Sequence, residues 1–279
     1  MAIEAFIRFA DSDGTENYGE VSQQQLACDL RGVSVPILEG TPWTGFKRLD
    51  QQKTVCQVLC PLEKTPLIIC IGLNYKQHAE ESKHEISEYP VVFTKPPDAL
   101  AGPFDVIKVH PDAQSYLDYE AELTVIVGRD AKNVQASKAL SYVLGYTNGN
   151  DVSARNFQAP NASGGQFCYA KSFDSFAPIG PAVVLASKIT DPQNLRLYSK
   201  VNGGIRQETN TNDMIWTVSQ LIEHLSRGTT LRAGTVIMTG TPSGVGIFME
   251  PRGMVGHGDV VHVGMDGLGE LANEFDFEK

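Results

Sequence analysis

Residues 119–127 read Tyr-Glu-Ala-Glu-Leu-Thr-Val-Ile-Val, and this stretch organises the interpretation of the whole chain. Its β-branched residues, followed by Gly128, are typical of a β-strand. Because side chains alternate between the two faces of a strand, Glu120 and Glu122 leave the same face. Like charges side by side on a strand are destabilising. The pair therefore indicates contact with solvent, a basic group or a cation.

The composition of the 279 residues is that of a globular protein, with 42% hydrophobic residues and 26 glycines that favour turn-rich β structure. A net charge of -10 argues against a general nucleic-acid-binding protein, which needs a basic surface. The longest apolar run, residues 67–73, is too short to span a membrane, and the first residues do not resemble a secretory signal. We therefore expect neither nucleic acid nor a membrane as partner.

The five cysteines have no spacing typical of a zinc site or a redox pair. Reduced thiols of this kind are typical of intracellular proteins. We expect a cytoplasmic location, with the mitochondrion as the alternative.

Prolines and glycines, which interrupt regular secondary structure, divide the chain into two predicted domains. Residues 1–65 consist of short segments and predict a small N-terminal α+β domain without catalytic residue types in a suggestive spacing. Residues 66–279 predict a larger, β-rich catalytic domain of the α+β class. In this part, Asn202-Gly203 is a strong hairpin signal, and apolar residues at helical spacing predict a helix over 214–225.

A short helix is predicted to start at Tyr75, with Asn74 as its N-cap. Three residues separate His78 from Glu81, so the two side chains share a face of this helix. A carboxylate beside a histidine orients the ring and raises its basicity, which is the minimal general-base pair. A charged surface helix without function is the alternative.

Three carboxylates are candidate oxygen ligands: Glu120, Glu122 and Asp151, the last in a bend at the end of a predicted strand. An all-oxygen set suits Mg²⁺, Mn²⁺ or Ca²⁺ better than Zn²⁺. An ion-free network of salt bridges is the alternative. The glycine-rich run 239–246 could bring backbone amides close to an anion, although it lacks the Gly-Lys-Ser/Thr of a phosphate loop.

Taken together, the ordered motifs resemble the fumarylacetoacetate hydrolase family over residues 67–273. The motifs are Ile-Gly-Leu-Asn-Tyr (71–75), Phe-Thr-Lys-Pro (93–96), Tyr-Glu-Ala-Glu-Leu (119–123), the segment 145–158, Lys-Ser-Phe-Asp (171–174), Val-Asn-Gly (201–203), Arg-Gln (206–207) and the run 239–246.

The resemblance implies a mixed β-roll or sandwich that forms homodimers, with Mg²⁺ or Mn²⁺, or alternatively Ca²⁺, on the three carboxylates. It implies a lid helix that carries His78 and Glu81 as catalytic residues, and a catalytic Lys171 near the substrate oxygens. Substrate-binding positions are implied at four further residues: Arg155, Gln158, Gly240 and Thr241.

The activity implied by the resemblance is metal-dependent chemistry on small 2-oxo or β-diketo acids through a stabilised enolate. Hydrolysis of a carbon–carbon bond in acylpyruvate-type substrates is the first expectation. Oxaloacetate decarboxylation, keto–enol tautomerisation and isomerisation of 2-hydroxyhepta-2,4-dienedioate are the alternatives. A non-catalytic, metal-stabilised binding protein is an alternative of another class, although His78 and Glu81 favour an enzyme.

Overall fold

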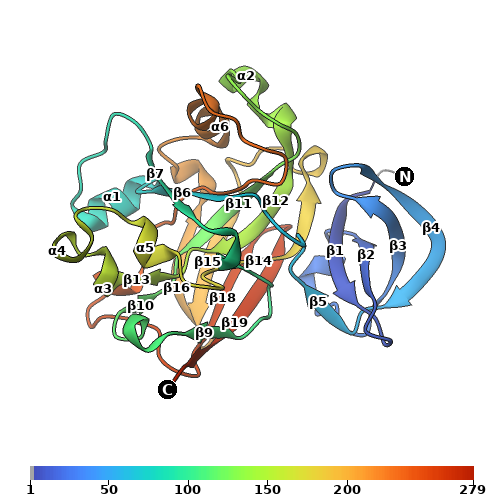
Figure 1. The fold of residues 1–279 in the computed structure, drawn as a ribbon, viewed down its shortest axis with the longest axis horizontal. Coiled ribbons are helices and arrows are strands. Elements are labelled where there is room, and N and C mark those ends of the chain that lie inside the picture. The colour runs from blue at the N-terminus through green and yellow to red at the C-terminus, as the bar shows by residue number, and fades with distance from the viewer. Residues whose placement is uncertain (1–2) are drawn as a thin grey trace.

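The computed structural model describes residues 3–279, and most of their regular structure is β-strand, as the sequence predicts (Figure 1). The strands are β1 (Ala5–Ala10), β2 (Glu16–Val21), β3 (Ser34–Thr41), β4 (Gly45–Thr54), β5 (Gln57–Leu59), β6 (Ile68–Gly72), β7 (Val91–Lys95), β8 (Leu100–Ala101), β9 (Ile107–Val109), β10 (Leu117–Asp118), β11 (Ala121–Val127), β12 (Val143–Asn150), β13 (Ser153–Ala154), β14 (Ala177–Leu185), β15 (Arg196–Val201), β16 (Gly204–Asn210), β17 (Val236–Met238), β18 (Val260–Met265) and β19 (Gly269–Phe277). The α-helices are α1 (Lys76–Ser82), α2 (Ala136–Ala139), α3 (Arg155–Gln158), α4 (Pro160–Ser163), α5 (Cys168–Lys171) and α6 (Val218–Ser226).

Strand β11, from the stretch 119–127, lies inside the largest sheet. The main path of that sheet runs β4-β3-β2-β1-β14-β12-β11-β17-β6-β7. Strand β11 pairs antiparallel with β12 and with β17, and every one of its residues is buried. One of its faces packs into one apolar cluster through Leu123 and Val125, and Ile126 packs into a second cluster. An acidic side chain on such a strand is therefore held away from solvent.

A second sheet, of order β16-β15-β18-β19-β9, packs against the large one and completes a β-sandwich. Its strands contact β11, β12 and β14. The predicted hairpin joins β15 to β16, and Asn202 and Gly203 both have positive φ angles, of 50° and 81°. These angles are those of the tight turn that the Asn-Gly pair favours. The predicted β-rich fold class is thus confirmed.

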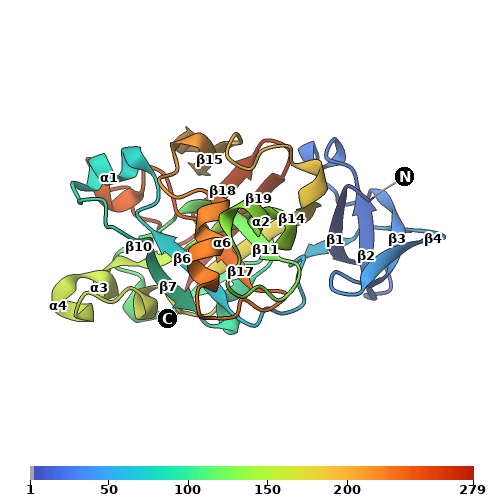
Figure 2. The ribbon, with the colours of Figure 1, turned by 90° about the horizontal axis from the view of Figure 1, so that it is seen from above.

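The N-terminal strands and the short helices lie at opposite ends of an elongated molecule (Figures 1 and 2). Strands β1–β5 form one end, while α1, α3, α4 and α5 form the other. Strand β1 also pairs with β14, so the large sheet runs from one end into the body. Among the described residues before α1 there is no α-helix, and this part is all-β where the sequence predicts α+β. Residues 1–65 remain a proposed domain.

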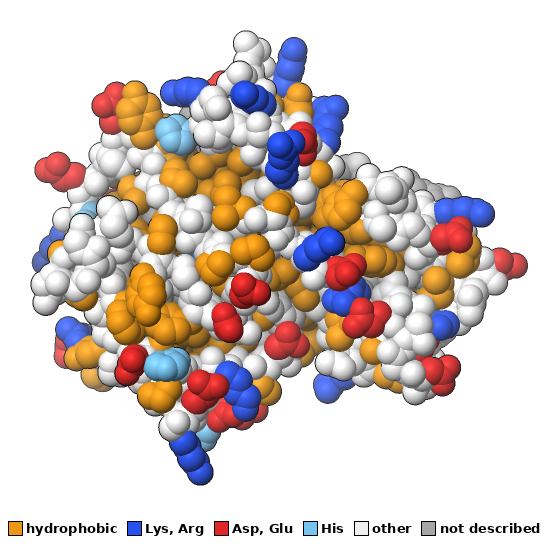
Figure 3. All heavy atoms as spheres, in the orientation of Figure 1, with side chains coloured by type: hydrophobic (Ala, Val, Ile, Leu, Met, Phe, Trp, Pro, Cys, Tyr) orange, Lys and Arg blue, Asp and Glu red, His pale blue; other side chains and the backbone are white. Residues whose placement is uncertain are grey.

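Helix α6 begins later than the predicted helix over 214–225. Thr217 is its N-cap and forms a capping box with Gln220, so the first turn starts at Val218. Met214 instead forms an isolated antiparallel β-bridge with Tyr75, the residue before α1. Within residues 3–279, no helix combines the length and apolar character needed to cross a membrane. In Figure 3, basic side chains gather at the top of the view, where α2 lies, and scattered acidic and basic side chains lie among hydrophobic ones over the rest of that face.

Candidate active site

The register of β11 with β12 brings the three predicted carboxylates together. Ala121 pairs with Asn150 in this antiparallel ladder, so the start of β11 lies against the end of β12. The backbone N–H of Asp151 donates to the carbonyl of Glu120 at 2.9 Å. Glu122 is two residues along the same strand face. One ligand atom from each carboxylate lies within 4.8 Å of the others.

The three carboxylates are buried, although Glu120 keeps 6% of its surface exposed and lines a cavity. Burial of this much negative charge requires compensation. Lys171, in α5, supplies part of it, because its Nζ lies 2.8 Å from Glu120 Oε2 and 2.8 Å from Asp151 Oδ2. Arg155, in α3, places Nη2 2.7 Å from Glu120 Oε1.

Two charged residues that the sequence analysis did not assign complete this network. Lys95, at the end of β7, is fully buried, with Nζ 2.5 Å from Asp151 Oδ1 and 3.1 Å from the carbonyl oxygen of Val152. Asp118, in β10, is also fully buried and pairs with Arg155. Asp118 continues the two-residue spacing of Glu120 and Glu122, and this spacing could have indicated it. The sequence around Lys95 has no such spacing, and Lys95 stands out only as part of the Phe-Thr-Lys-Pro motif (93–96).

Among the described residues, Glu122 is the one of the three candidate ligands that has no cationic partner. Its Oε2 accepts a hydrogen bond from the backbone N–H of Gly240 at 2.7 Å. Its Oε1 is buried and has no hydrogen-bond partner among residues 3–279. Burial, and then the charges of Asp151 and Glu120, raise the pKa of Glu122 well above its usual range.

The pKa of Glu120 moves in the opposite direction. Burial alone would raise it, but Lys171 and Arg155 outweigh burial and lower the pKa to about 2. Burial would lower the pKa of Lys171, yet Asp151 and Glu120 raise it, so the ammonium stays charged. Of the glutamates Glu120 and Glu122, Glu122 is thus the one whose ionised form is disfavoured in the metal-free protein.

A divalent cation fits this arrangement. The donor set is all oxygen, which Mg²⁺, Mn²⁺ and Ca²⁺ prefer. The orphaned Oε1 of Glu122 is a buried acceptor of the kind that a cation satisfies. Glu120, Glu122 and Asp151 are therefore the residues that would hold the ion. The ion-free alternative leaves Glu122 unexplained, since Lys95, Lys171 and Arg155 all pair with other acids.

His78 and Glu81 form the predicted pair on α1. His78 Nδ1 lies 2.9 Å from Glu81 Oε2, and His78 is only 8% exposed, so α1 is not a freely solvated surface helix. Glu81 Oε1 accepts the backbone N–H of Gly244 at 2.9 Å, which ties the helix to the glycine-rich run. Because Nδ1 is held by Glu81, Nε2 is the ring nitrogen left for a substrate. Asn74 is not the cap of α1, because its amide bonds the carbonyls of Thr239 and Trp216 instead.

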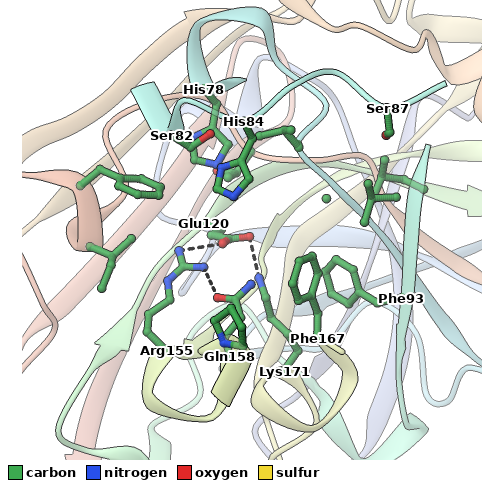
Figure 4. A pocket seen from close by; sticks show the side chains of 18 of the residues that line it. His78, Ser82, His84, Ser87, Phe93, Glu120, Arg155, Gln158, Phe167 and Lys171 are labelled. Carbon is green, nitrogen blue, oxygen red and sulfur yellow. Dashed lines mark hydrogen bonds and ion pairs between the residues drawn. The ribbon is translucent and has the colours of Figure 1, made fainter. Parts of the chain in front are cut away.

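A cavity of about 500 Å³ reaches this network at Glu120, whereas Glu122 and Asp151 do not line it (Figure 4). Four of the predicted residues, His78, Arg155, Gln158 and Lys171, point into it around Glu120. Thr241 also lines it. Glu81 lies behind His78, and Gly240 lies behind Glu122, so these two support the site without lining the cavity. Apolar side chains form much of the remaining wall: Ile71, Leu73, Val91, Phe93, Phe167, Ile247 and Phe248.

In this β-sandwich, three buried carboxylates lie beside a lysine and an arginine, close to a histidine–glutamate pair. These features are typical of enzymes that bind a metal ion through carboxylates. The sequence model of the family described as "Fumarylacetoacetate (FAA) hydrolase C-terminal" matches residues 67–276. The chain therefore belongs to the fumarylacetoacetate hydrolase family, as its motifs predict.

Relatives of known name agree with this assignment. A "Fumarylacetoacetate hydrolase domain-containing protein 2 homolog" from Dictyostelium discoideum is 42% identical over 227 residues, 78% of this chain and 73% of that protein. "Oxaloacetate tautomerase YisK" from Bacillus subtilis (strain 168) is 43% identical over 209 residues, 74% of this chain and 68% of that protein. The crystal structure of 2-hydroxyhepta-2,4-diene-1,7-dioate isomerase from Mycobacterium marinum superposes with a TM-score of 0.82 at 31% identity, covering 99% of each chain.

Proposed function

We propose that this protein is a divalent-metal-dependent enzyme that interconverts the keto and enol forms of small 2-oxo acids, with oxaloacetate as the representative substrate. The observation that carries the proposal is the buried Glu122 carboxylate, one oxygen of which has no partner among the described residues, beside Glu120 and Asp151. Of these three acids Glu120 lines the cavity, together with His78. The tautomerase name of a relative at 43% identity supports the choice of reaction. Mg²⁺ or Mn²⁺ is the proposed ion, with Ca²⁺ as the alternative.

The proposed chemistry needs negative charge to be stabilised on the substrate oxygens. When bound, the cation would act as a Lewis acid toward those oxygens. Lys171, whose ammonium lies between Glu120 and Asp151, adds fixed positive charge in the same place. Arg155 and Gln158, hydrogen-bonded to each other at 2.9 Å, line the wall and orient the substrate.

His78 is the proposed proton carrier. Its Nε2 removes a proton from the carbon next to the oxo group and returns one to the oxo oxygen, so that keto and enol forms exchange with no net change in atoms. Glu81 holds Nδ1 and stabilises the imidazolium that forms during the transfer. The apolar wall limits the access of water, which favours tautomerisation over hydrolysis.

Carbon–carbon hydrolysis of acylpyruvate-type substrates is the second candidate. One observation favours it: the apolar wall formed by Val91, Phe93 and Phe167 suits an acyl tail better than a second carboxylate. The same pair of residues, His78 and Glu81, could activate a water molecule for attack. Homodimer formation and the cytoplasmic location remain further proposals.

A mass-balance assay separates these reactions. The purified protein is incubated with oxaloacetate or acetylpyruvate, in Mg²⁺ or in excess chelator, and the enol/keto ratio, pyruvate, acetate and CO₂ are followed. We expect metal-dependent acceleration of enol–keto exchange of oxaloacetate with little CO₂. Release of acetate and pyruvate from acetylpyruvate, without accelerated exchange, would instead support the hydrolase. Full activity in excess chelator would contradict both.

A further inference from the structure

Asp118 is a buried carboxylate that contacts two residues of the cavity wall, Arg155 and Ile247. Its Oδ1 accepts the backbone N–H groups of Tyr119 at 3.0 Å and Gly246 at 2.7 Å. Its Oδ2 accepts the N–H of Ile247 at 3.1 Å and Arg155 Nε at 2.8 Å. Arg155 Nη2 also lies 2.8 Å from Oδ2. With no surface exposed, Asp118 cannot touch a substrate in the cavity.

Arg155 has five N–H groups in a rigid planar fork. Nε is held by Asp118, and Nη2 lies between Asp118 and Glu120. Nη1 donates to Gln158 Oε1 at 2.9 Å. Nη1 carries two N–H groups, so one of them has no partner among the described residues. Arg155 lines the cavity, and this remaining N–H is the donor that it can offer there.

The same carboxylate also holds the turn that carries two other residues of the cavity wall, Ile247 and Phe248. The turn η7 (Gly246–Phe248) hangs on Asp118 through the N–H groups of Gly246 and Ile247. A Cβ at Gly246 would meet Asp118 Oδ1 at 2.7 Å, which shows how closely the turn approaches. The Phe248 ring at the end of this turn lies 5.9 Å from the ring of His78.

We propose that Asp118 is a positioning residue. It orients the guanidinium of Arg155 so that the N–H of Nη1 that Gln158 does not accept is available to a substrate oxygen. It also sets the distance between Arg155 and the turn that carries Phe248 next to His78. The proposal rests on the proposed function, in which Arg155 binds the 2-oxo acid. A carboxylate with a purely structural role would instead hold the turn without affecting substrate affinity.

The test is a double-mutant cycle with Asp118→Asn and Arg155→Gln, using oxaloacetate and Mg²⁺. Asparagine keeps an acceptor for the turn but loses the charge that fixes the guanidinium. We expect Asp118→Asn to raise KM at least about fivefold, with kcat changed less than about twofold, because a charge-assisted contact to the substrate is misplaced. Because Asp118 acts through Arg155, the double variant should have the KM of Arg155→Gln alone.

A matched control is Asp11→Asn, since Asp11 also accepts backbone N–H groups, from Asp13 and Thr15, but in the N-terminal strands. It should lower the melting temperature without changing KM. An unchanged KM in Asp118→Asn, or single effects that multiply in the double variant, would overturn the proposal. Absence of activity in the wild-type protein would refute the proposed function instead.

A second variant covers the case in which Asp118→Asn does not fold. Arg155→Lys keeps the positive charge near Glu120 but lacks the fork that spans Asp118 and the cavity. It should raise KM as much as Arg155→Gln does. A wild-type KM in Arg155→Lys would show that charge alone suffices and would overturn the proposal.

Discussion

Replacing Glu122 with glutamine separates the cost of its buried charge from its use in binding a cation. In the metal-free protein one oxygen of Glu122 accepts the Gly240 N–H, and the other has no partner among residues 3–279. Burial and the neighbouring acids raise the pKa of Glu122, so its ionised form is disfavoured. The glutamine side chain introduced by Glu122→Gln has nearly the same shape, and its amide can donate toward Glu120 and Asp151.

The two expected effects of Glu122→Gln, on the stability of the metal-free protein and on the stabilisation by the cation, have opposite signs. Relief of an unsatisfied buried group should stabilise the chelator-treated protein by about 1–3 kcal/mol. At about 2 °C per kcal/mol for a chain of this size, the melting temperature should rise by about 2–6 °C. A cation at 100 times its Kd stabilises the wild-type protein by about 2.7 kcal/mol. Loss of a ligand should weaken affinity at least as much as the roughly 10–100-fold seen for outer-sphere changes, and this removes most of that gain.

The assay is thermal unfolding of both proteins in excess EDTA and in saturating Mg²⁺, with calorimetric titration of the metal. The matched control is Glu274→Gln, an exposed acid on β19, which should change neither melting temperature nor metal affinity. A Glu122→Gln protein that is less stable than the wild type in EDTA would refute the proposed cost of the buried charge. Equal stabilisation of both proteins by Mg²⁺ would refute the role of Glu122 as a ligand.

Three further predictions concern the same network. Lys171→Met should destabilise the metal-free protein by about 3–5 kcal/mol, because Glu120 and Asp151 lose a shared buried cation. In thermal unfolding, Mg²⁺ should raise the melting temperature of this variant more than that of the wild type. His78→Gln should lower kcat for enol–keto exchange by about 10²–10⁴-fold without changing metal affinity. The control His262→Gln breaks a similar His–Glu pair, at 2.9 Å, and should leave kcat unchanged. Equal losses of kcat in the two variants would contradict the role of His78. The raised pKa of Glu122 means that the folded chain holds a proton that the unfolded chain releases above pH 4.5, so the stability of the metal-free protein falls as pH rises. The Mg²⁺-induced rise in melting temperature should therefore be larger at about pH 8 than at about pH 6. The same rise at both pH values would contradict this prediction.

The period of two along β11 made the pairing of Glu120 with Glu122 predictable, since it needs only local geometry. Their contact with Asp151 depends on the antiparallel register of β11 with β12, which local patterns do not determine. The sequence offers Asp151 as an oxygen-ligand candidate in a bend at the end of a predicted strand, and the family resemblance implies that it shares a metal with the two glutamates. The prediction that the like-charge pair meets a basic group or cation holds for Glu120, which contacts Lys171 and Arg155.

The residues that escaped prediction act through long-range contacts. Lys95 is the end of an ordinary buried strand until the chain folds and its ammonium reaches Asp151. Asn74 is a residue type that often caps helices, yet its side-chain amide donates hydrogen bonds to the carbonyls of Thr239 and Trp216, because the glycine-rich run passes beside it. In the N-terminal part, short segments between glycines and prolines suggested helix as well as strand, and pairing along one sheet decided for strand.

The proposed function depends above all on a divalent cation held jointly by Glu120, Glu122 and Asp151, of which Glu120 lines the cavity. Crystals grown with Mn²⁺ allow anomalous diffraction to locate the ion directly. The structure predicts one strong peak within ligand distance of all three carboxylates, and its loss in Asp151→Asn. An anomalous peak elsewhere in the chain, with Glu120 and Asp151 paired only with Lys95, Lys171 and Arg155, would contradict this cation site.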